Sequence, residues 1–199
     1  MKTALMPMVL GLWLLAAGTG SWILLKYENS PGRSAATPQQ WPAEARIPWP
    51  QTGPLMVMFA HPRCPCTRAS IEELNCVMAH CKGRLSATVL FVQPSAMPDD
   101  WVSGTLWKSA AAIPGVSVQA DRDGIESRRF GADTSGFTLL YAPDGQLMFK
   151  GGITAGRGHA GDSAGAGAIV SIVARTGTKV RQAPVFGCGL IDPCKVSAN

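Results

Sequence analysis

The fold of this chain is decided by residues 55–66, which read Leu55-Met56-Val57-Met58-Phe59-Ala60-His61-Pro62-Arg63-Cys64-Pro65-Cys66. The first six residues are apolar without interruption, which predicts a strand buried in the middle of a sheet. His61-Pro62-Arg63 ends this strand. Pro65 favours a helix start, because a proline at the first helical position gives up no helical hydrogen bond. The sequence therefore places Cys64 and Cys66 where a buried strand meets a helix.

Strands and helices alternate along the rest of the chain. The helix after Cys64 is expected to run to about Lys82 and to end at Gly83, with an apolar stripe on one face. Further strands are predicted at residues 87–92, 116–120, 137–141 and 147–149, and further helices at 101–112, 124–130 and 168–175. Pro143-Asp144-Gly145 suits the turn of a closing hairpin. The pattern predicts an α/β fold with a mostly parallel central sheet, a C-terminal β-hairpin and helices on both faces.

An apolar run from Ala4 to Leu25 precedes this domain and contains no charged residue. As a helix it is roughly 33 Å long, enough to cross a bilayer core of about 30 Å. We therefore expect one N-terminal transmembrane helix that acts as a signal anchor. A cleaved signal peptide is the alternative, with its cleavage site in the small residues 16–21. Either interpretation exports the rest of the chain.

The chain divides into four parts by composition. Residues 1–27 are the anchor or signal segment, 28–50 a proline-rich linker, 51–178 the folded domain, and 179–199 an extended tail that contains cysteine. The net charge of +5 comes from scattered residues, so the sequence predicts no nucleic-acid partner. Six cysteines in 199 residues suggest a redox or metal function instead.

The chemistry of Cys64 and Cys66 follows from their place at a helix start. A thiolate is the reactive form of cysteine, and the positive end of a helix stabilises it. Arg63 adds a further positive charge beside them. A bridge between residues two apart would be strained, so this couple is expected to be oxidising. The alternative is that one or both are buried structural thiols.

Several motifs resemble a known group of proteins. They are residues 61–70 (His61-Pro62-Arg63-Cys64-Pro65-Cys66-Thr67-Arg68-Ala69-Ser70), 151–154 (Gly-Gly-Ile-Thr), 157–162 (Arg-Gly-His-Ala-Gly-Asp) and 184–188 (Pro-Val-Phe-Gly-Cys). Together they resemble the RedB-type proteins, a membrane-anchored branch of the thioredoxin-like superfamily related to TlpA and the peroxiredoxins. The resemblance implies a thioredoxin-like fold. It also places Thr67 at the second cysteine position of the family motif, and Gly136 near the family's cis-proline.

The remaining candidate residues carry open alternatives. His61 is either a proton acceptor for a thiol or a polar strand end. Cys188 is a resolving thiol that returns over the active site, a structural bridge partner, for example of Cys194, or free. Arg157 and His159 lie either beside Cys64 or in a structural network in which Asp162 caps the next helix. Cys81 is expected in the core and Cys76 outside it, with their pairing open.

The sequence thus favours a thiol–disulfide oxidoreductase that needs no cofactor and acts on protein thiols or disulfides in the periplasm. We expect it to sit in the bacterial inner membrane as a single-pass protein, or to be secreted after signal cleavage. One alternative is a copper(I)-binding or copper-delivery module that resembles the Sco type, with Cys64, Cys66 and His159 as ligands. Others are a peroxiredoxin-like peroxidase that uses Cys64 and Thr67, and a redox-inactive docking domain.

Overall fold

The structure is a computed structural model, and it describes residues 2–50 and 52–191, which form two units divided between Ser30 and Pro31. The first unit contains helix α1 (Lys2–Glu28). Its segment Met6–Glu28 has a mean hydropathy of 1.8 and none of it is buried, so it is long and apolar enough to cross a membrane. The expected N-terminal apolar helix is therefore confirmed.

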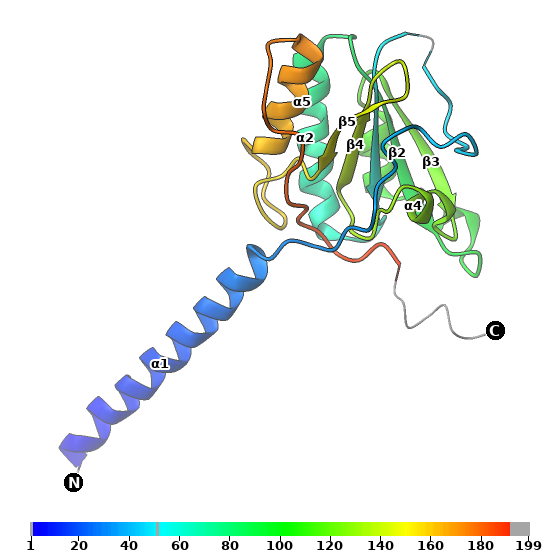
Figure 1. Cartoon of the computed structure of the whole chain (residues 1–199). Helices are drawn as coiled ribbons and strands as arrows, with labels where there is room; N and C mark the ends of the chain where they lie inside the picture. The colour runs from blue at the N-terminus through cyan, green and yellow to red at the C-terminus, as the bar shows by residue number, and fades with distance from the viewer. Residues whose placement is uncertain (1, 51, 192–199) are drawn as a thin grey trace. The chain divides into compact units, whose positions relative to one another are not determined.

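The second unit is built on a five-stranded sheet in the order β3-β2-β1-β4-β5 (Figure 1). Strand β1 (Leu55–Ala60) lies in the middle, with β2 (Ser86–Gln93) and then β3 (Val116–Arg122) parallel to it on one side. On the other side, β4 (Phe137–Tyr141) and β5 (Leu147–Gly151) form the antiparallel hairpin. The predicted mixed sheet and its closing hairpin are confirmed.

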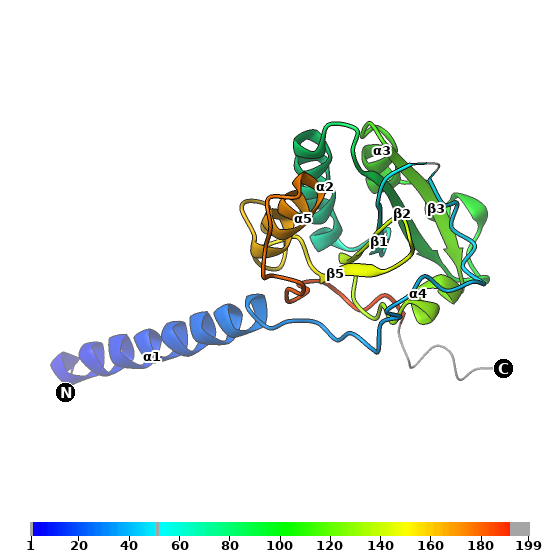
Figure 2. The same cartoon turned by 45° about the horizontal axis from the view of Figure 1, so that its top comes forward.

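The two faces of the sheet are covered differently. Side chains alternate along β1, so that Met56 and Met58 belong to one core cluster while Val57 and Phe59 belong to the other. Helices α2 (Pro65–Cys81), α3 (Thr105–Ala111) and α5 (Ala164–Ala174) contribute to the first cluster. Helices α2 and α5 lie side by side in both views (Figures 1 and 2). Helix α4 (Ile125–Arg129) lies on the other face, where Phe130 follows it into the second cluster.

Two predicted helices differ from the structure. The helix expected at 101–112 is split into a 3-10 turn at Asp99–Trp101 and α3, because Gly104 has an extended backbone and begins the second piece. Helix α5 begins earlier than expected, at Ala164. The side chain of Ser163 caps it by accepting a hydrogen bond from the Ala166 N–H at 3.1 Å. Asp162, the expected cap, is exposed.

Residues 31–50 do not form a free linker, and we call them the strap. Their main chain bonds to the domain at several points, including Ala35 N–H to Gly131 oxygen at 3.0 Å and Trp41 N–H to Gly145 oxygen at 2.8 Å. Ile47 is buried, and the Trp41 ring packs against Phe130 and Tyr141. The prolines keep this segment extended, but its apolar side chains cover the second face of the sheet.

The chain after α5 also packs back onto the domain, and we call residues 179–191 the return segment. It is extended, as expected, but it pairs with the outer strand β5 through Lys150 and residues 181–183. Val185 and Leu190 are buried in the second core cluster. This pairing fixes the path of the segment that carries Cys188. Cys194 lies outside the described residues.

Candidate functional site

The site begins at the carboxyl end of β1, where the chain turns into α2. The N–H of Cys64 donates to the carbonyl of His61 at 3.2 Å, which closes a turn over residues 61–64. Cys64 is extended (φ −88°, ψ 124°) and stands directly before Pro65, the first residue of the helix. The expected cysteine pair at a helix start is therefore present. Main-chain N–H groups of the first helical turn point toward this position.

The return segment places Cys188 beside this junction. Residues around Gly189 pair in antiparallel fashion with the loop before β4, through an isolated bridge to Thr134. The Ser135 N–H donates to the Cys188 carbonyl at 2.8 Å, and the Leu190 N–H donates to the Asp133 carbonyl at 2.9 Å. Two main-chain hydrogen bonds thus hold the backbone on both sides of Gly189. Cys188, which is 124 residues from Cys64, is fixed in front of the start of α2.

Three sulfur atoms meet at this point. The Sγ atoms of Cys64 and Cys188 lie 2.7 Å apart, and both residues are free thiols. The Cys66 Sγ completes a group in which all three sulfurs lie within 4.8 Å of one another. Cys64 is 3% exposed, while Cys66 and Cys188 are partly exposed. Cys64 is therefore the innermost of the three residues, and Cys66 and Cys188 lie closer to the surface.

The three thiols differ in acidity. Burial raises the pKa of Cys64, but hydrogen bonds from the Cys188 thiol and from the main-chain N–H groups of residues 188, 66 and 67 outweigh this effect and lower it. Burial and the neighbouring Cys64 raise the pKa of Cys66. Burial and the same neighbour raise the pKa of Cys188 to about 12. Cys64 is therefore the most acidic of the three thiols, and its thiolate is the one that these surroundings favour.

Arg157 supplies the positive charge at the site. Its guanidinium donates a hydrogen bond to the carbonyl of Gly187, next to Cys188. It also acts through charge to lower the pKa of Cys66, against the larger effects that raise it. The loop that carries Arg157 is tied to α2, because the Gly161 N–H donates to the Glu73 carboxylate at 2.6 Å. The predicted neighbour Arg157 is thus brought to the sulfurs.

Arg63 does not act as the sequence suggested. Its guanidinium lies over the Trp101 ring, 5.2 Å from the ring centroid. It is not among the groups that lower the pKa of Cys64. The cation–π contact holds this side chain against the 3-10 turn after β2. Arg157, from a distant loop, is the arginine whose charge lowers the pKa of Cys66.

His61 and Thr67 stabilise the turn that positions the sulfurs. The His61 Nδ1 accepts a hydrogen bond from the Arg63 N–H at 3.2 Å, and its ring packs edge-on against Trp101. The Thr67 hydroxyl bonds to the His61 carbonyl at 3.1 Å and to the Ser135 hydroxyl at 2.8 Å. The Thr67 side chain therefore joins the end of β1, the start of α2 and the loop before β4. The His61 side chain joins the turn after β1 to the 3-10 turn at Trp101.

Gly136 and His159 complete the set of predicted residues. Gly136 has a positive φ of 89° and its N–H donates to the Phe59 carbonyl at 2.7 Å. The described residues contain no cis peptide bond, so Gly136, which the resemblance placed near the family's cis-proline, has a trans peptide bond and a positive φ. His159 is exposed, and the group of sulfur ligands does not include it. A metal set of Cys64, Cys66 and His159 is therefore not assembled here.

The other cysteines lie where the helix pattern placed them. Cys81 is buried in the core, and burial raises its pKa. Cys76 is exposed. Sequence reasoning missed Ser135, which bonds to Thr67 and, through its hydroxyl, accepts the His61 N–H at 2.9 Å. It also missed Gly187, where a Cβ would overlap the Ser135 carbonyl oxygen. A glycine directly before a cysteine was the one signal for this close approach.

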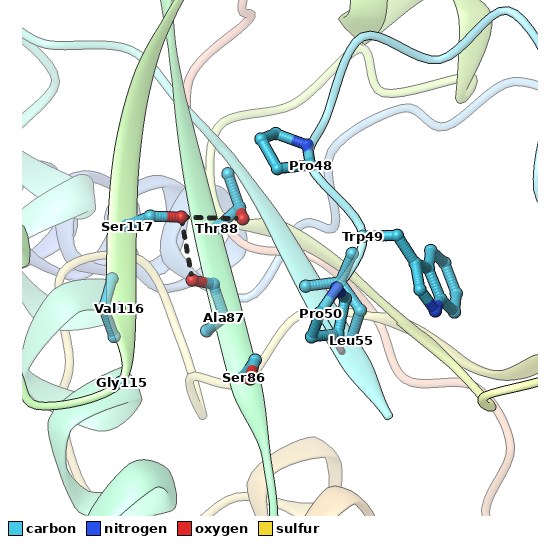
Figure 3. A pocket seen from close by; sticks show the side chains of 10 residues that line it. All are labelled: Pro48, Trp49, Pro50, Leu55, Ser86, Ala87, Thr88, Gly115, Val116 and Ser117. Atoms are coloured by element: carbon cyan, nitrogen blue, oxygen red, sulfur yellow. Dashed lines mark hydrogen bonds between the residues drawn. The ribbon is translucent and has the colours of Figure 1, made fainter. Parts of the chain in front are cut away.

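A shallow pocket lies at the opposite edge of the sheet. Pro48, Trp49 and Pro50 of the strap form one side of it, and the first residues of β1, β2 and β3 form the other (Figure 3). The Thr88 and Ser117 hydroxyls bond to each other within it at 2.9 Å. Because parallel strands carry their active sites at their carboxyl ends, we place the functional site at the three sulfurs and not here.

Comparisons with known proteins support the fold. No protein-family model and no curated protein matches the chain. A solved structure of a hypothetical protein from Sinorhizobium meliloti aligns with a TM-score of 0.59, at 19% identity, over 81% of this chain and 93% of that one. An uncharacterised protein from Geobacillus kaustophilus aligns at 0.58, with 14% identity over 83% and 95% of the two chains. A secreted disulfide oxidoreductase from Mycobacterium tuberculosis aligns at 0.43, with 15% identity over 62% and 81%.

The fold and the position of the cysteines define the class of protein. A central strand leads into a long helix whose first turn holds the cysteines, and the sheet ends in an antiparallel hairpin followed by a helix. This is the thioredoxin-like fold that the motifs implied. The likeness to the RedB-type branch in particular stays a prediction.

Proposed function

We propose that this chain is a thiol–disulfide oxidoreductase whose redox couple is formed by Cys64 and Cys188. The observation that carries the proposal is the 2.7 Å separation of their sulfur atoms. A disulfide bond of about 2.05 Å needs the two atoms to approach by only about 0.7 Å. This couple joins the helix start to the return segment, and it replaces the strained bridge between Cys64 and Cys66 that the sequence suggested.

The two sulfurs suit different roles in exchange. In the oxidised chain, a partner thiolate attacks the Sγ of Cys188, the more exposed residue of the couple, and the S–S electron pair passes to the Sγ of Cys64. A sulfur of low pKa leaves faster, and the N–H groups around Cys64 stabilise its thiolate. The partner's second thiolate then attacks its own mixed disulfide and releases Cys188, which takes a proton from solvent. Two electrons pass to the chain, and the reverse sequence reduces a partner disulfide.

The other candidate functions have less support. A peroxidase that uses Cys64 with Thr67 would need the Thr67 hydroxyl to face the reacting sulfur, whereas this hydroxyl bonds to Ser135 and to the His61 carbonyl. A redox-inactive docking domain would not explain three converging thiols of different acidity.

The couple can be tested on the full chain in detergent. We expect oxidised glutathione, followed by alkylation and peptide mass analysis, to yield a Cys64–Cys188 disulfide. Cys64→Ser and Cys188→Ser should each abolish insulin reduction and the refolding of scrambled ribonuclease, whereas Cys76→Ser, a change at an exposed cysteine outside the site, should leave both intact. A Cys64–Cys66 disulfide with full activity in Cys188→Ser would overturn the assigned couple.

We also propose that α1 anchors the chain in the inner membrane of a bacterium with the domain in the periplasm. The length and apolar character of α1 support this placement. Exposed Cys76 offers a reporter on the domain surface. In cells with a permeabilised outer membrane, a membrane-impermeant maleimide should label Cys76 before lysis. Labelling only after lysis would contradict the periplasmic placement, and a mature protein without α1 would indicate signal cleavage.

A further inference from the structure

The three sulfur atoms form a potential metal-binding site that shares Cys64 and Cys188 with the redox couple and adds Cys66. Cys64 comes from the end of the turn that follows β1, Cys66 from the first turn of α2, and Cys188 from the return segment. Among residues 2–50 and 52–191, these three are brought together with every pair of sulfurs within 4.8 Å. The group contains no carboxylate and no imidazole. A set of thiolates alone selects soft metal ions.

The geometry suits a three-coordinate ion. A metal–thiolate bond of about 2.3 Å places three sulfurs about 4 Å apart around a trigonal centre. Every present separation lies within 4.8 Å, so the three sulfurs are gathered on the scale of such a centre. The Cys188 and Cys64 sulfurs, now 2.7 Å apart, must separate by about 1.3 Å to reach that spacing. The partial exposure of Cys66 and Cys188 gives the ion a path from solvent.

The surroundings offset the charge of such a site. Three thiolates and one monovalent ion leave two net negative charges. The start of α2 presents free N–H groups and the positive end of its dipole to the sulfurs. The Arg157 guanidinium, held at the Gly187 carbonyl, adds a positive charge beside Cys188. These groups stabilise an anionic metal–thiolate centre without supplying a further ligand.

From this geometry we infer that the reduced chain binds one Cu(I) ion through Cys64, Cys66 and Cys188. Three thiolates complete a trigonal Cu(I) centre, whereas Zn(II) would need a fourth ligand such as water, and an iron–sulfur cluster takes four cysteines; the described residues bring three sulfurs together. Binding forms three Cu–S bonds, releases the thiol protons to solvent and changes no oxidation state. A Cys64–Cys188 disulfide removes two of the ligands, so metal binding and oxidation exclude each other.

The site can be tested by anaerobic titration of the reduced full chain with Cu(I) against bathocuproine disulfonate. We expect one tightly bound ion per chain, and X-ray absorption with three sulfur neighbours at about 2.3 Å. Cys66→Ser and Cys188→Ser, which change partly exposed side chains, should each weaken binding by at least about tenfold. The controls His159→Ala and Cys76→Ser should bind as the unchanged chain does, and the oxidised chain should not bind.

Three results would overturn the inference. Unchanged affinity in Cys188→Ser would indicate a two-coordinate site on Cys64 and Cys66. Weaker binding in His159→Ala would restore the cysteine–histidine set. Failure of the reduced chain to compete for Cu(I), with disulfide exchange intact, would exclude the metal site and leave the redox proposal standing. Conversely, a chain that binds Cu(I) tightly but has no disulfide-exchange activity would exclude the redox proposal and leave the metal site standing.

Discussion

The Arg157 guanidinium donates a hydrogen bond to the main-chain oxygen of Gly187, the residue before Cys188. Arg157 comes from the loop between β5 and α5, and this loop is tied to α2 by the hydrogen bond from Gly161 to Glu73. The helix that carries Cys66 and the segment that carries Cys188 are therefore connected through a second path, in addition to their sulfur contact. This connection makes Arg157 a positioning residue for Cys188.

Replacing Arg157 should make formation of the Cys64–Cys188 disulfide less favourable. A hydrogen bond from a charged donor contributes about 1.5 kcal/mol, so Arg157→Ala should lower the effective concentration of Cys188 at Cys64 by about tenfold. Equilibration of the full chain with glutathione buffers measures this quantity directly. Arg181→Ala removes an exposed arginine from the same return segment and should have no effect. Equal changes in the two variants would contradict a positioning role for Arg157.

The close approach of Gly187 to Ser135 gives a second prediction. A Cβ on residue 187 would overlap the Ser135 carbonyl oxygen, so Gly187→Ala should force the return segment away from the loop before β4. We expect a loss of about 1–3 kcal/mol in unfolding free energy and a weaker Cys64–Cys188 disulfide.

Gly189→Ala is the matched control, because a Cβ there meets no atom within 4 Å. Urea unfolding and glutathione equilibration on both variants separate the two positions. An unchanged stability of the Cys64–Cys188 disulfide in Gly187→Ala would contradict this prediction. It would show that the pairing of residues 187–190 with the loop before β4 does not position Cys188.

The central part of the fold could be predicted from sequence because local signals determine it. The apolar run Leu55–Ala60 forms β1 with the expected bounds, and Pro65 begins α2 as expected. Strand β2 and the hairpin follow from similar runs between turn residues. Helix α5 was placed too late, because Gly165 and Gly167 in its first turn have low helix propensity and the Ser163 cap was overlooked.

The assembly of the site could be predicted only in part. The Cys64–Cys66 junction is local, so the sequence located it. The approach of Cys188 depends on main-chain hydrogen bonds between the return segment and residues 133–135. Main-chain pairing does not require particular side chains, so the sequence does not reveal it. For the same reason the sequence indicates Arg63, the sequence neighbour of Cys64, as a source of positive charge and leaves the position of Arg157 open.

The strap gives a third prediction, on stability. Its prolines suggested a linker, but Trp41 and Ile47 bury apolar surface against the domain. A chain that begins at Pro31 should therefore unfold with the free energy of the full-length domain. A chain that begins at Gly53 should lose at least about 3 kcal/mol, the cost of removing a packed tryptophan and a buried isoleucine. Urea unfolding of both chains, followed by tryptophan fluorescence and circular dichroism, tests this prediction. Equal stability of the two chains would show that residues 31–50 act as a linker and do not stabilise the domain.

Tyr141 makes the stability of the contact between the strap and the domain dependent on pH. Its side chain is fully buried, its hydroxyl donates to the Pro38 carbonyl in the strap at 2.9 Å, and burial raises its pKa. In the unfolded chain a tyrosine ionises near pH 10. Because the folded pKa is higher, the unfolded chain releases this proton first, and the stability contributed by the neutral hydroxyl is complete below about pH 10 and is lost as pH rises through the folded pKa.

Tyr141→Phe should therefore cost about 1 kcal/mol at pH 7, where it removes only the hydrogen bond to Pro38. Above about pH 10 the unchanged chain should lose up to about 1.4 kcal/mol per pH unit more than the variant, so that the two have equal stability near pH 11. Urea unfolding of both proteins between pH 7 and pH 11 gives this difference and cancels the titration of the other groups. A difference that stays constant over this range would show that Tyr141 ionises as readily in the folded chain as in the unfolded one.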